Sequence, residues 1–255
     1  MYYNNNNKIY LNIKRVNYMY KNIQSQFSIK FPRYPLIRRK VNDIEDILIS
    51  SYNQPQILPL PDEVNPELPR IIFNSKNGHS NIQISQISIT LNIIYDDKFC
   101  FNVDRCFSYI QERINLINQI MNKLSILKFC YCGLTHITAE ILDNPVSILS
   151  EKFNITTKSN IIYQIQQCTT EISQQKFFIN KNIQSYEKEK NIDFREINEL
   201  KHFSNLQIPK ERGILRSWDI NNRYEYLYNN IEQDISEFIP LYHSIFNLMK
   251  KYVVN

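Results

Sequence analysis

Apolar and polar residues alternate along several stretches of the chain, and this period of two predicts strands. In NIQSQFSIKF, residues 22–31, apolar side chains recur at every second position from Phe27 to Phe31, with polar side chains between them. One face of such a strand is buried and the other meets solvent. Further segments rich in β-branched and aromatic residues predict strands at 126–138, 161–169, 175–180 and 214–220.

Other segments repeat their apolar residues every three or four positions, which predicts helices. The clearest stripe consists of Val103, Phe107, Ile110, Ile114, Ile117, Met121 and Leu124. A second stripe runs from Ile231 to Met249, with Pro240 either kinking this helix or starting its second part. VNDIEDILISSY, residues 41–52, predicts a short helix. Each long stripe can pack on a sheet or on a partner helix.

The stretch over residues 55–80 is rich in residues that break regular structure. It holds five of the ten prolines and one of the three glycines of the chain. Each proline fixes its own φ angle and disfavours a helical conformation at the residue before it, so we expect an extended connector over residues 55–69. Asn77 and Gly78 suit the tight turn of a hairpin between RIIFNS and HSNIQIS.

The segment NIQISQISITLNIIY, residues 81–95, changes the phase of its alternation. Apolar residues stand at even positions at Ile82 and Ile84 but at odd positions after Ser85. We expect one strand with a bulge or a bend near Ser85. Farther along, a charged segment over residues 182–203 is expected to interrupt the later strands.

Strands, a hairpin and a long helix follow one another twice along the chain. This order predicts an α+β protein in which an antiparallel sheet packs against two long helices, because hairpins precede each helix. The repetition suggests a duplicated β-hairpin-plus-helix unit. The corresponding organisation is a basic, Asn-rich extension over residues 1–18, a first unit over 19–145 and a second unit over 146–255. One continuous domain is the alternative.

Charge is distributed unevenly, although the net charge is only +5. Residues 1–40 contain nine Lys or Arg and no Asp or Glu, so the rest of the chain carries 21 basic against 25 acidic side chains, or −4. A basic segment of this kind attracts phosphates or an acidic protein surface. Its candidate contacts for a protein or nucleic-acid partner are Lys30, Arg33, Arg38, Arg39 and Lys40.

Most catalytic chemistries lack the residues that they need. The chain has only three glycines, and it contains neither a GxGxxG nor a Walker motif. No serine stands in a GxSxG elbow. The five cysteines and four histidines show no metal-ligand spacing, so we expect no metal and no cofactor.

One pattern does point to catalysis. Pro61-Asp62 followed by Asp96-Asp97-Lys98 is similar to the PD…DxK signature of a large nuclease superfamily. Two acidic groups and a lysine at adjacent strand ends would bind Mg²⁺ and orient a water for phosphodiester cleavage. A metal-dependent nuclease built on Asp62, Asp96, Asp97 and Lys98 is therefore an alternative, and it requires these side chains to converge.

Neither a membrane span nor a signal peptide is predicted. No window approaches the roughly 18 unbroken apolar residues of a membrane span, and the N-terminus MYYNNNNKIY lacks the apolar core of a signal peptide. We therefore expect a cytoplasmic protein without membrane contact.

The order of several segments resembles an uncharacterised, sporadically distributed family of bacterial proteins of about this length. The similar segments are a first strand near Met19, ELPRIIFNSKNGHSNIQIS, YDDKFCFNV, LKFCYCGLTHIT, ILRSWDI and LYHSIFNLMKKYV, which together span residues 19–253. The family has no established activity, so the resemblance implies no catalytic residues. Its scattered distribution is typical of accessory or defence-linked genes.

The sequence favours a non-enzymatic protein that binds another macromolecule. The binding surface is expected in the basic segment, at the sheet edges or along the proline connector. The partner is expected to be a protein, and self-association is a further option. Such a protein would act as an adaptor, antitoxin-like or chaperone-like component of a bacterial accessory or defence system. A sequence-tolerant nucleic-acid-binding protein is an alternative, as is the nuclease.

Overall fold

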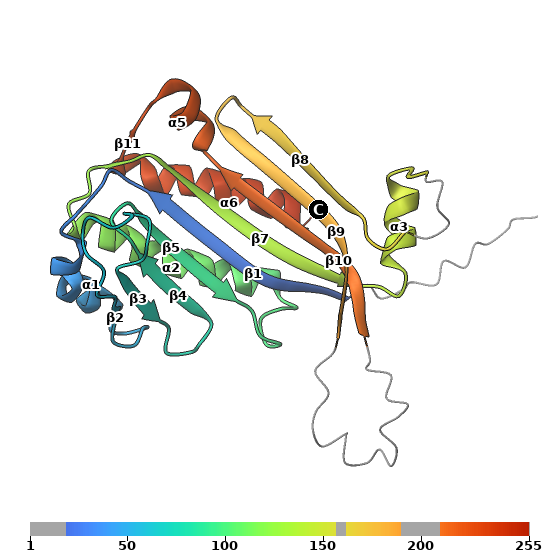
Figure 1. Cartoon of the computed structure of the whole chain (residues 1–255), viewed down its shortest axis with the longest axis horizontal. Helices are drawn as coiled ribbons and strands as arrows, with labels where there is room; N and C mark the ends of the chain where they lie inside the picture. The colour runs from blue at the N-terminus through green and yellow to red at the C-terminus, as the bar shows by residue number, and fades with distance from the viewer. Residues whose placement is uncertain (1–18, 157–161, 190–209, 255) are drawn as a thin grey trace, which may run out of the picture.

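The computed structural model describes residues 19–156, 162–189 and 210–254. They form an α+β fold, as predicted, around an antiparallel sheet of nine strands (Figure 1). Across the sheet the strands are β2 (Gln56–Ile57), β3 (Ile71–Asn74), β4 (Ser80–Ile84), β5 (Ser88–Ile94), β1 (Met19–Lys30), β7 (Tyr131–Ile141), β10 (Lys210–Asn221), β9 (Phe177–Glu189) and β8 (Gln166–Ser173). Two short strands, β6 (Lys128–Phe129) and β11 (Gln233–Asp234), pair separately.

The same order of elements occurs twice. β1 is followed by α1 (Val41–Leu48), by β3 to β5 and by α2 (Val103–Lys123), while β7 is followed by α3 (Pro145–Lys152), by β8 to β10 and by α6 (Phe238–Val254). In each half the first strand pairs with the last, β1 with β5 and β7 with β10. The halves meet where β1 pairs with β7. In this order of elements the second half begins with β7, which pairs with β1, while residue 146 lies in α3.

The two long helices lie on the same face of the sheet (Figure 1). The predicted stripe of α2 is buried there, with Ile110, Ile114 and Ile117 fully covered. α6 begins at Phe238, so Pro240 stands in its first turn, where its missing N–H removes no intrahelical hydrogen bond. One core cluster includes residues of both halves, so the two halves bury their apolar surface together.

The opposite face of the sheet is turned toward the viewer in Figure 1. It carries polar side chains that form hydrogen bonds across the strands. Gln26 donates to Asn92 (2.7 Å), which donates to Asn81 (3.0 Å). Thr170 donates to Asn180 in the same way (2.8 Å). We call this surface the polar face. Cross-strand pairs of this kind hold the register of a sheet whose second face meets solvent.

Two predicted boundaries differ from the structure. Residues 81–95 form two strands rather than one bent strand, because the chain reverses at Ser85. The Ser85 hydroxyl accepts hydrogen bonds from the N–H groups of Ile87 (3.1 Å) and Ser88 (2.9 Å), and this turn causes the change of phase. β9 extends to Glu189, so residues 182–189 of the predicted interruption pair with β10. The rest of that segment and the extension 1–18 lie outside the described residues.

The hairpin follows the prediction, and the connector follows it only in its first half. Gly78 stands between β3 and β4 with a φ of +75°, a conformation that side chains disfavour. Residues 55–61 contain the two-residue strand β2 and no turn or helix, as expected for a connector with repeated prolines. The following residues form two turns instead, in which Val64 N–H donates to the oxygen of Pro61 (3.3 Å) and Leu68 N–H to that of Asn65 (3.1 Å).

Candidate functional site

The predicted basic residues lie at one end of the sheet and bind the proline connector. Lys30 forms an ion pair with Glu67 (2.7 Å), and Arg38 forms one with Asp62 (2.7 Å). Arg33 donates to the backbone oxygen of Asp62 (2.6 Å). These basic groups therefore neutralise acidic groups of the same chain.

The two remaining candidates differ from each other. Lys40 pairs with Asp43 at the start of α1 (3.2 Å). Arg39 is exposed and forms no ion pair with a described residue. Of the five predicted contact residues, Arg39 therefore keeps the most freedom to bind a partner.

A residue that the sequence analysis did not single out, Arg70, organises the connector from inside. Its side chain is fully buried, and it donates hydrogen bonds to the backbone oxygens of Leu68 (3.0 Å), Val64 (2.9 Å) and Pro61 (3.3 Å). A guanidinium group can satisfy several carbonyl groups at once because its donors form a fixed planar fork. The connector thus folds around one cation.

The residues of the nuclease hypothesis lie at opposite ends of β5. The Asp62 side chain accepts a hydrogen bond from Gln86 (3.3 Å), which stands just before β5. Asp96 follows the other end of β5 and accepts from the backbone N–H groups of Lys98 (3.0 Å) and Phe99 (3.2 Å). A strand of seven residues spans about 20 Å.

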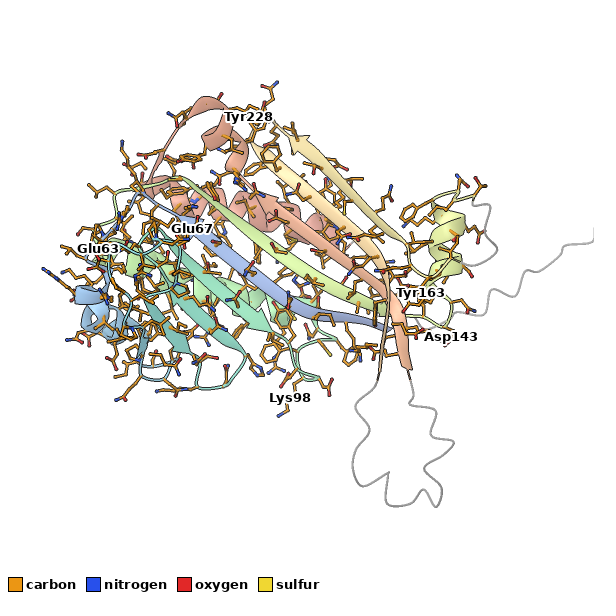
Figure 2. All side chains as sticks on the ribbon, in the orientation of Figure 1. Glu63, Glu67, Lys98, Asp143, Tyr163 and Tyr228 are labelled. Atoms are coloured by element: carbon orange, nitrogen blue, oxygen red, sulfur yellow. The ribbon has the colours of Figure 1, made fainter. Side chains whose placement is uncertain are left out.

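Asp97 and Lys98 are exposed beside Asp96, and Lys98 points away from the body of the protein (Figure 2). Glu63, next to Asp62, lies at the distant end of the same view. Among the described residues, no three His, Cys, Asp or Glu side chains gather to hold a metal ion. The structure thus lacks the converging carboxylates that the nuclease hypothesis requires.

Polar side chains also occur on the helix-covered face, along β7. His136, Thr138 and Glu140 stand at alternate positions, and all three are buried. Glu140 pairs with Arg216 of β10. Apolar side chains usually fill such buried positions. Polar groups there are expected to have hydrogen-bond partners.

His136 takes part in a continuous hydrogen-bonded chain. Its Nδ1 contacts the Ser25 hydroxyl (2.7 Å), and its Nε2 contacts Oδ1 of Asn22 (2.9 Å). Asn22 donates its own amide to the backbone oxygen of Cys100 (2.8 Å), so its Oδ1 is the acceptor and His136 carries the proton on Nε2. The Ser25 hydroxyl then donates to Nδ1 and accepts from Tyr95 (2.8 Å).

The hydrogen-bonded chain of Ser25, His136 and Asn22 is not arranged for catalysis. Burial lowers the pKa of His136 to about 3, so the imidazole is neutral at ordinary pH. Ser25 is buried and stays bonded between two neighbours. A nucleophile needs access to its substrate, which this arrangement does not give, and we interpret the chain as the satisfied polar centre of the core.

A cavity of about 640 Å³ lies where α2 begins and α6 ends, above the same row of strands. We call it the helix-end cavity. Its wall includes Tyr20 of β1, Thr138 of β7, Arg216 and Trp218 of β10, and Tyr252 of α6. None of these residues belongs to the sequence-predicted sites.

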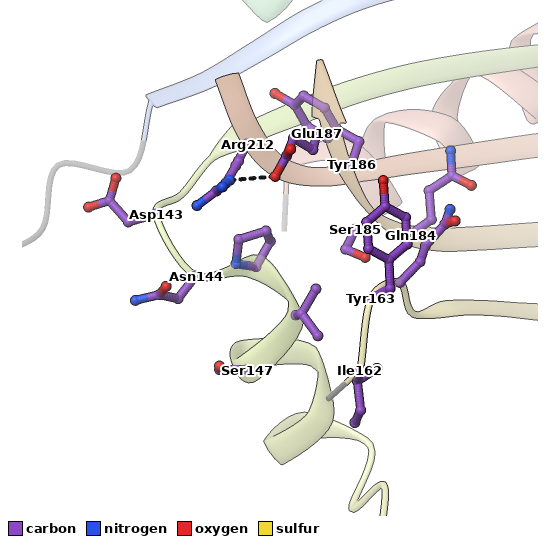
Figure 3. Close-up of a pocket in the computed structure, with 13 residues that line it drawn as sticks. Asp143, Asn144, Ser147, Ile162, Tyr163, Gln184, Ser185, Tyr186, Glu187 and Arg212 are labelled. Atoms are coloured by element: carbon purple, nitrogen blue, oxygen red, sulfur yellow. Dashed lines mark hydrogen bonds and ion pairs between the residues drawn. The ribbon is translucent and has the colours of Figure 1, made fainter. Parts of the chain in front are cut away.

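A second cavity of about 410 Å³ lies between α3 and the strands β9 and β10 (Figure 3). Several of its polar groups already have partners. Arg212 pairs with Glu187 (2.6 Å), and the Ser185 hydroxyl accepts from the N–H of Ile165 (3.0 Å). No buried polar atom without a partner belongs to the described residues of its wall.

The two edges of the sheet differ in exposure. β8 forms one edge with eight residues, of which the first seven are exposed, and within the described residues it pairs only with β9. β2 forms the other edge with two residues, and it is flanked by Pro55 and Pro59. Prolines and short length are devices that prevent strand addition at an edge, and β8 has neither.

A partly exposed aromatic cluster adjoins the end of β8 on the polar face. α5 (Arg223–Asn229) places Tyr224 4.7 Å from Tyr228 and 5.5 Å from Phe178, as ring-centre distances. Phe178 pairs in register with Ile172 of β8, which is 54% exposed. Tyr228 is 69% exposed and stands out at the end of the molecule (Figure 2).

Comparisons with known proteins add no assignment. Neither a scan against protein-family models nor a search of curated proteins found a match. The bacterial-family resemblance therefore stays a prediction. Within the described residues, no helix combines the length and the apolar character needed to cross a membrane.

Proposed function

We propose that this protein is a non-enzymatic binding protein that accepts an extended segment of a partner protein beside β8. The observation that carries the proposal is the eight-residue exposed edge of β8. In this role the protein would be a cytoplasmic adaptor, antitoxin-like or chaperone-like component of a bacterial accessory or defence system.

The backbone of β8 supplies the means of binding. In an antiparallel pair, alternate residues direct their N–H and C=O groups away from the neighbouring strand. Those of β8 that turn away from β9 are therefore open to an added strand, and main-chain hydrogen bonds of this type supply affinity in strand-addition complexes. The single charged side chain of β8, Glu171, is paired with Lys181 of β9, so this edge does not repel a partner strand of either charge.

The aromatic cluster beside β8 supplies an anchor. Ile172 and Tyr228 are exposed at the point where the edge strand ends, and the half-buried ring of Phe178 lies beside both. Aromatic residues at the centre of an interface commonly carry a large share of its binding energy. We therefore expect the partner segment to be uncharged, β-prone and equipped with a large apolar residue that contacts Tyr228.

The experiment is an affinity capture from a lysate of the producing cells, with and without nuclease treatment, using wild-type protein and three variants. Gln167→Lys adds a charge to the edge at a residue with no side-chain hydrogen bond among the described residues. Tyr228→Ser removes the exposed ring. Ser50→Lys adds the same charge at an exposed position after α1 and serves as the control.

We expect a stoichiometric protein that survives nuclease treatment and binds wild type and Ser50→Lys alike. Its recovery should fall at least tenfold with Gln167→Lys, because lysine on an edge opposes strand pairing. Equal recovery with all variants would contradict the use of β8. Recovery of nucleic acid alone, lost steeply as salt rises, would replace the proposal with nucleic-acid binding through residues such as Arg39.

A further inference from the structure

We propose that the helix-end cavity binds a small organic oxyanion, a carboxylate or a phosphate carried on a flat aromatic body. The proposal does not rest on strand addition at β8, although Tyr252 of the cavity wall donates a hydrogen bond to Glu171 of β8 (3.4 Å). A volume of about 640 Å³ falls within the range of small-molecule sites in proteins.

Two polar groups of the cavity wall lack partners. Thr138 is 5% exposed, and its hydroxyl has no hydrogen-bond partner among the described residues. Nη1 of Arg216 is likewise buried without a partner, while Nη2 of the same guanidinium donates to Glu140. Thr138 and Arg216 stand directly opposite each other on β7 and β10. Buried polar groups are normally paired, so two open donors side by side indicate a missing acceptor.

The charged side chains that line the cavity favour a negatively charged acceptor. Lys21, Lys152 and Arg216 line the cavity, and no carboxylate does so among its described residues. Lys21 is 3.7 Å from Glu211, whereas Lys152 is exposed and forms no ion pair with a described residue. Arginine and lysine together favour a carboxylate or phosphate ligand, with arginine fixing its orientation.

The aromatic side chains of the cavity wall favour a ligand with a flat, apolar part. Tyr20, Phe101, Trp218 and Tyr252 contribute four aromatic rings to one cavity. Arg216 already lies over the ring of Tyr20, at 5.2 Å from its centre. Aromatic walls with few polar groups are typical of sites that hold flat, apolar ligand bodies and use the polar groups for orientation.

The experiment uses the fluorescence of Trp218, the single tryptophan of the chain, which stands in the wall itself. Wild-type protein is titrated with benzoate and with adenosine monophosphate, which distinguish a carboxylate from a phosphate ligand. Adenosine carries the aromatic group without the anion, and inorganic phosphate carries the anion without the aromatic group, so both serve as partial probes. We expect saturable quenching with at least one of the two aromatic anions and at least tenfold weaker binding of the partial probes.

Thr138→Val removes the open hydroxyl and keeps the shape of the side chain. We expect at least tenfold weaker binding with unchanged or higher resistance to urea, because the variant no longer buries an unpaired polar group. Thr135→Val, on the same strand but on the polar face, should bind as wild type. Lys152→Gln, at an exposed position, should weaken binding about threefold and reduce its salt dependence.

Two results would overturn the proposal. One is the absence of saturable quenching with both aromatic anions at millimolar concentration in folded wild-type protein. The other is equal affinity in wild type, Thr138→Val and Lys152→Gln, which would show that the probes bind elsewhere. Circular dichroism of each variant establishes that the protein titrated is folded.

Discussion

A single neutral histidine lies at the centre of this protein's core. His136 is buried between Ser25 and Asn22, and both of its nitrogens have partners. Protonation at Nδ1 would force the Ser25 hydroxyl to accept instead of donate, and it would place a charge in an apolar environment. Burial lowers its pKa to about 3, far below the ordinary value near 6.5. The protein therefore contains a group whose protonation competes with folding.

The sign of this competition gives a pH dependence. Between about pH 6.5 and pH 3 the unfolded chain binds a proton at His136 that the folded protein does not bind. The contribution of His136 to stability is complete above pH 6.5 and falls by on the order of 1 kcal/mol per pH unit below it. Urea unfolding at pH 7.5, 6.5, 5.5 and 4.5 measures this slope.

Two histidine variants separate this effect from general acid unfolding. His136→Gln should be less stable at pH 7.5 but should lose less stability than wild type between pH 6.5 and 5.5. His243→Gln, at an exposed position of α6, should retain the wild-type slope. The same slope in wild type and His136→Gln would show that other groups cause the pH dependence.

Residues of the helix-end cavity were harder to find from sequence than those of the core. In THITAE the polar side chains of His136, Thr138 and Glu140 recur at every second position, which places them on one face of a strand. That pattern predicts a solvated face. Here the same face lies under α2 and α6, so all three side chains are buried, which the local sequence does not reveal. Of the three, Thr138 lines the helix-end cavity.

At the scale of the element, the connector depends on Arg70 more than on the ion pairs around it. Arg70→Gln would leave the backbone oxygens of Pro61, Val64 and Leu68 without their buried donor. We expect a loss of about 2 kcal/mol of unfolding free energy, since hydrogen bonds to a charged group contribute about 1.5–3 kcal/mol and the oxygen of Pro61 keeps the Val64 N–H as a partner. Chemical denaturation measures the loss, and hydrogen exchange should show faster exchange in residues 58–70.

Arg38→Gln is the matched control for Arg70→Gln. It removes the partner of Asp62 from a partly exposed ion pair. Exposed pairs contribute about 0–1 kcal/mol, so the variant should unfold close to wild type. A larger loss with Arg38→Gln than with Arg70→Gln would contradict the central role of the buried guanidinium.

The contact between β7 and β10 makes a second prediction at this scale. A methyl group at Gly213 would stand 2.1 Å from the backbone oxygen of Glu140 and 2.8 Å from the ring of Tyr186. Gly213→Ala should therefore cost more than about 2 kcal/mol, as expected for an overpacked position. Gly78→Ala meets no neighbouring atom and should cost only about 1 kcal/mol, from its positive φ. Thermal unfolding of both variants tests this order.

The sequence predicted secondary structure best where one side of an element packs against a single continuous core. The apolar stripe of α2 predicted its helix to within one residue, because one side of α2 faces a continuous core. It was least informative at Ser85, where a phase change is compatible with either a bulge or a turn. Pairing with a distant strand decides between them: β4 and β5 pair with each other, and β5 then pairs with β1.

At the scale of the whole molecule, the two topological repeats share one hydrophobic core and are joined by one pair of strands. β1 and β7 pair from Met19 to Lys30, and the main core cluster includes α2 and α6. We therefore expect one cooperative unfolding transition. The fluorescence of Trp218, in the second half, and the far-ultraviolet circular dichroism of the whole chain should change at the same urea concentration.

Leu134→Ala tests the shared core directly. Leu134 is fully buried on β7 and pairs in register with Phe27 of β1. The variant should lose about 2–5 kcal/mol and lower the midpoints of both signals together. A shift of the Trp218 signal alone would show that the halves unfold as separate domains.

The two sheet edges differ, and this difference limits how many strands one molecule can add. A protein with two open edges can add neighbours at both ends and grow into a filament, whereas β2, with two residues beside Pro55 and Pro59, stops growth at one end. If a partner strand adds at β8, as we propose, each molecule would accept one strand and would offer no further site of this kind within its described edges. Strand addition would thus produce complexes of fixed stoichiometry that stay the same size as concentration rises.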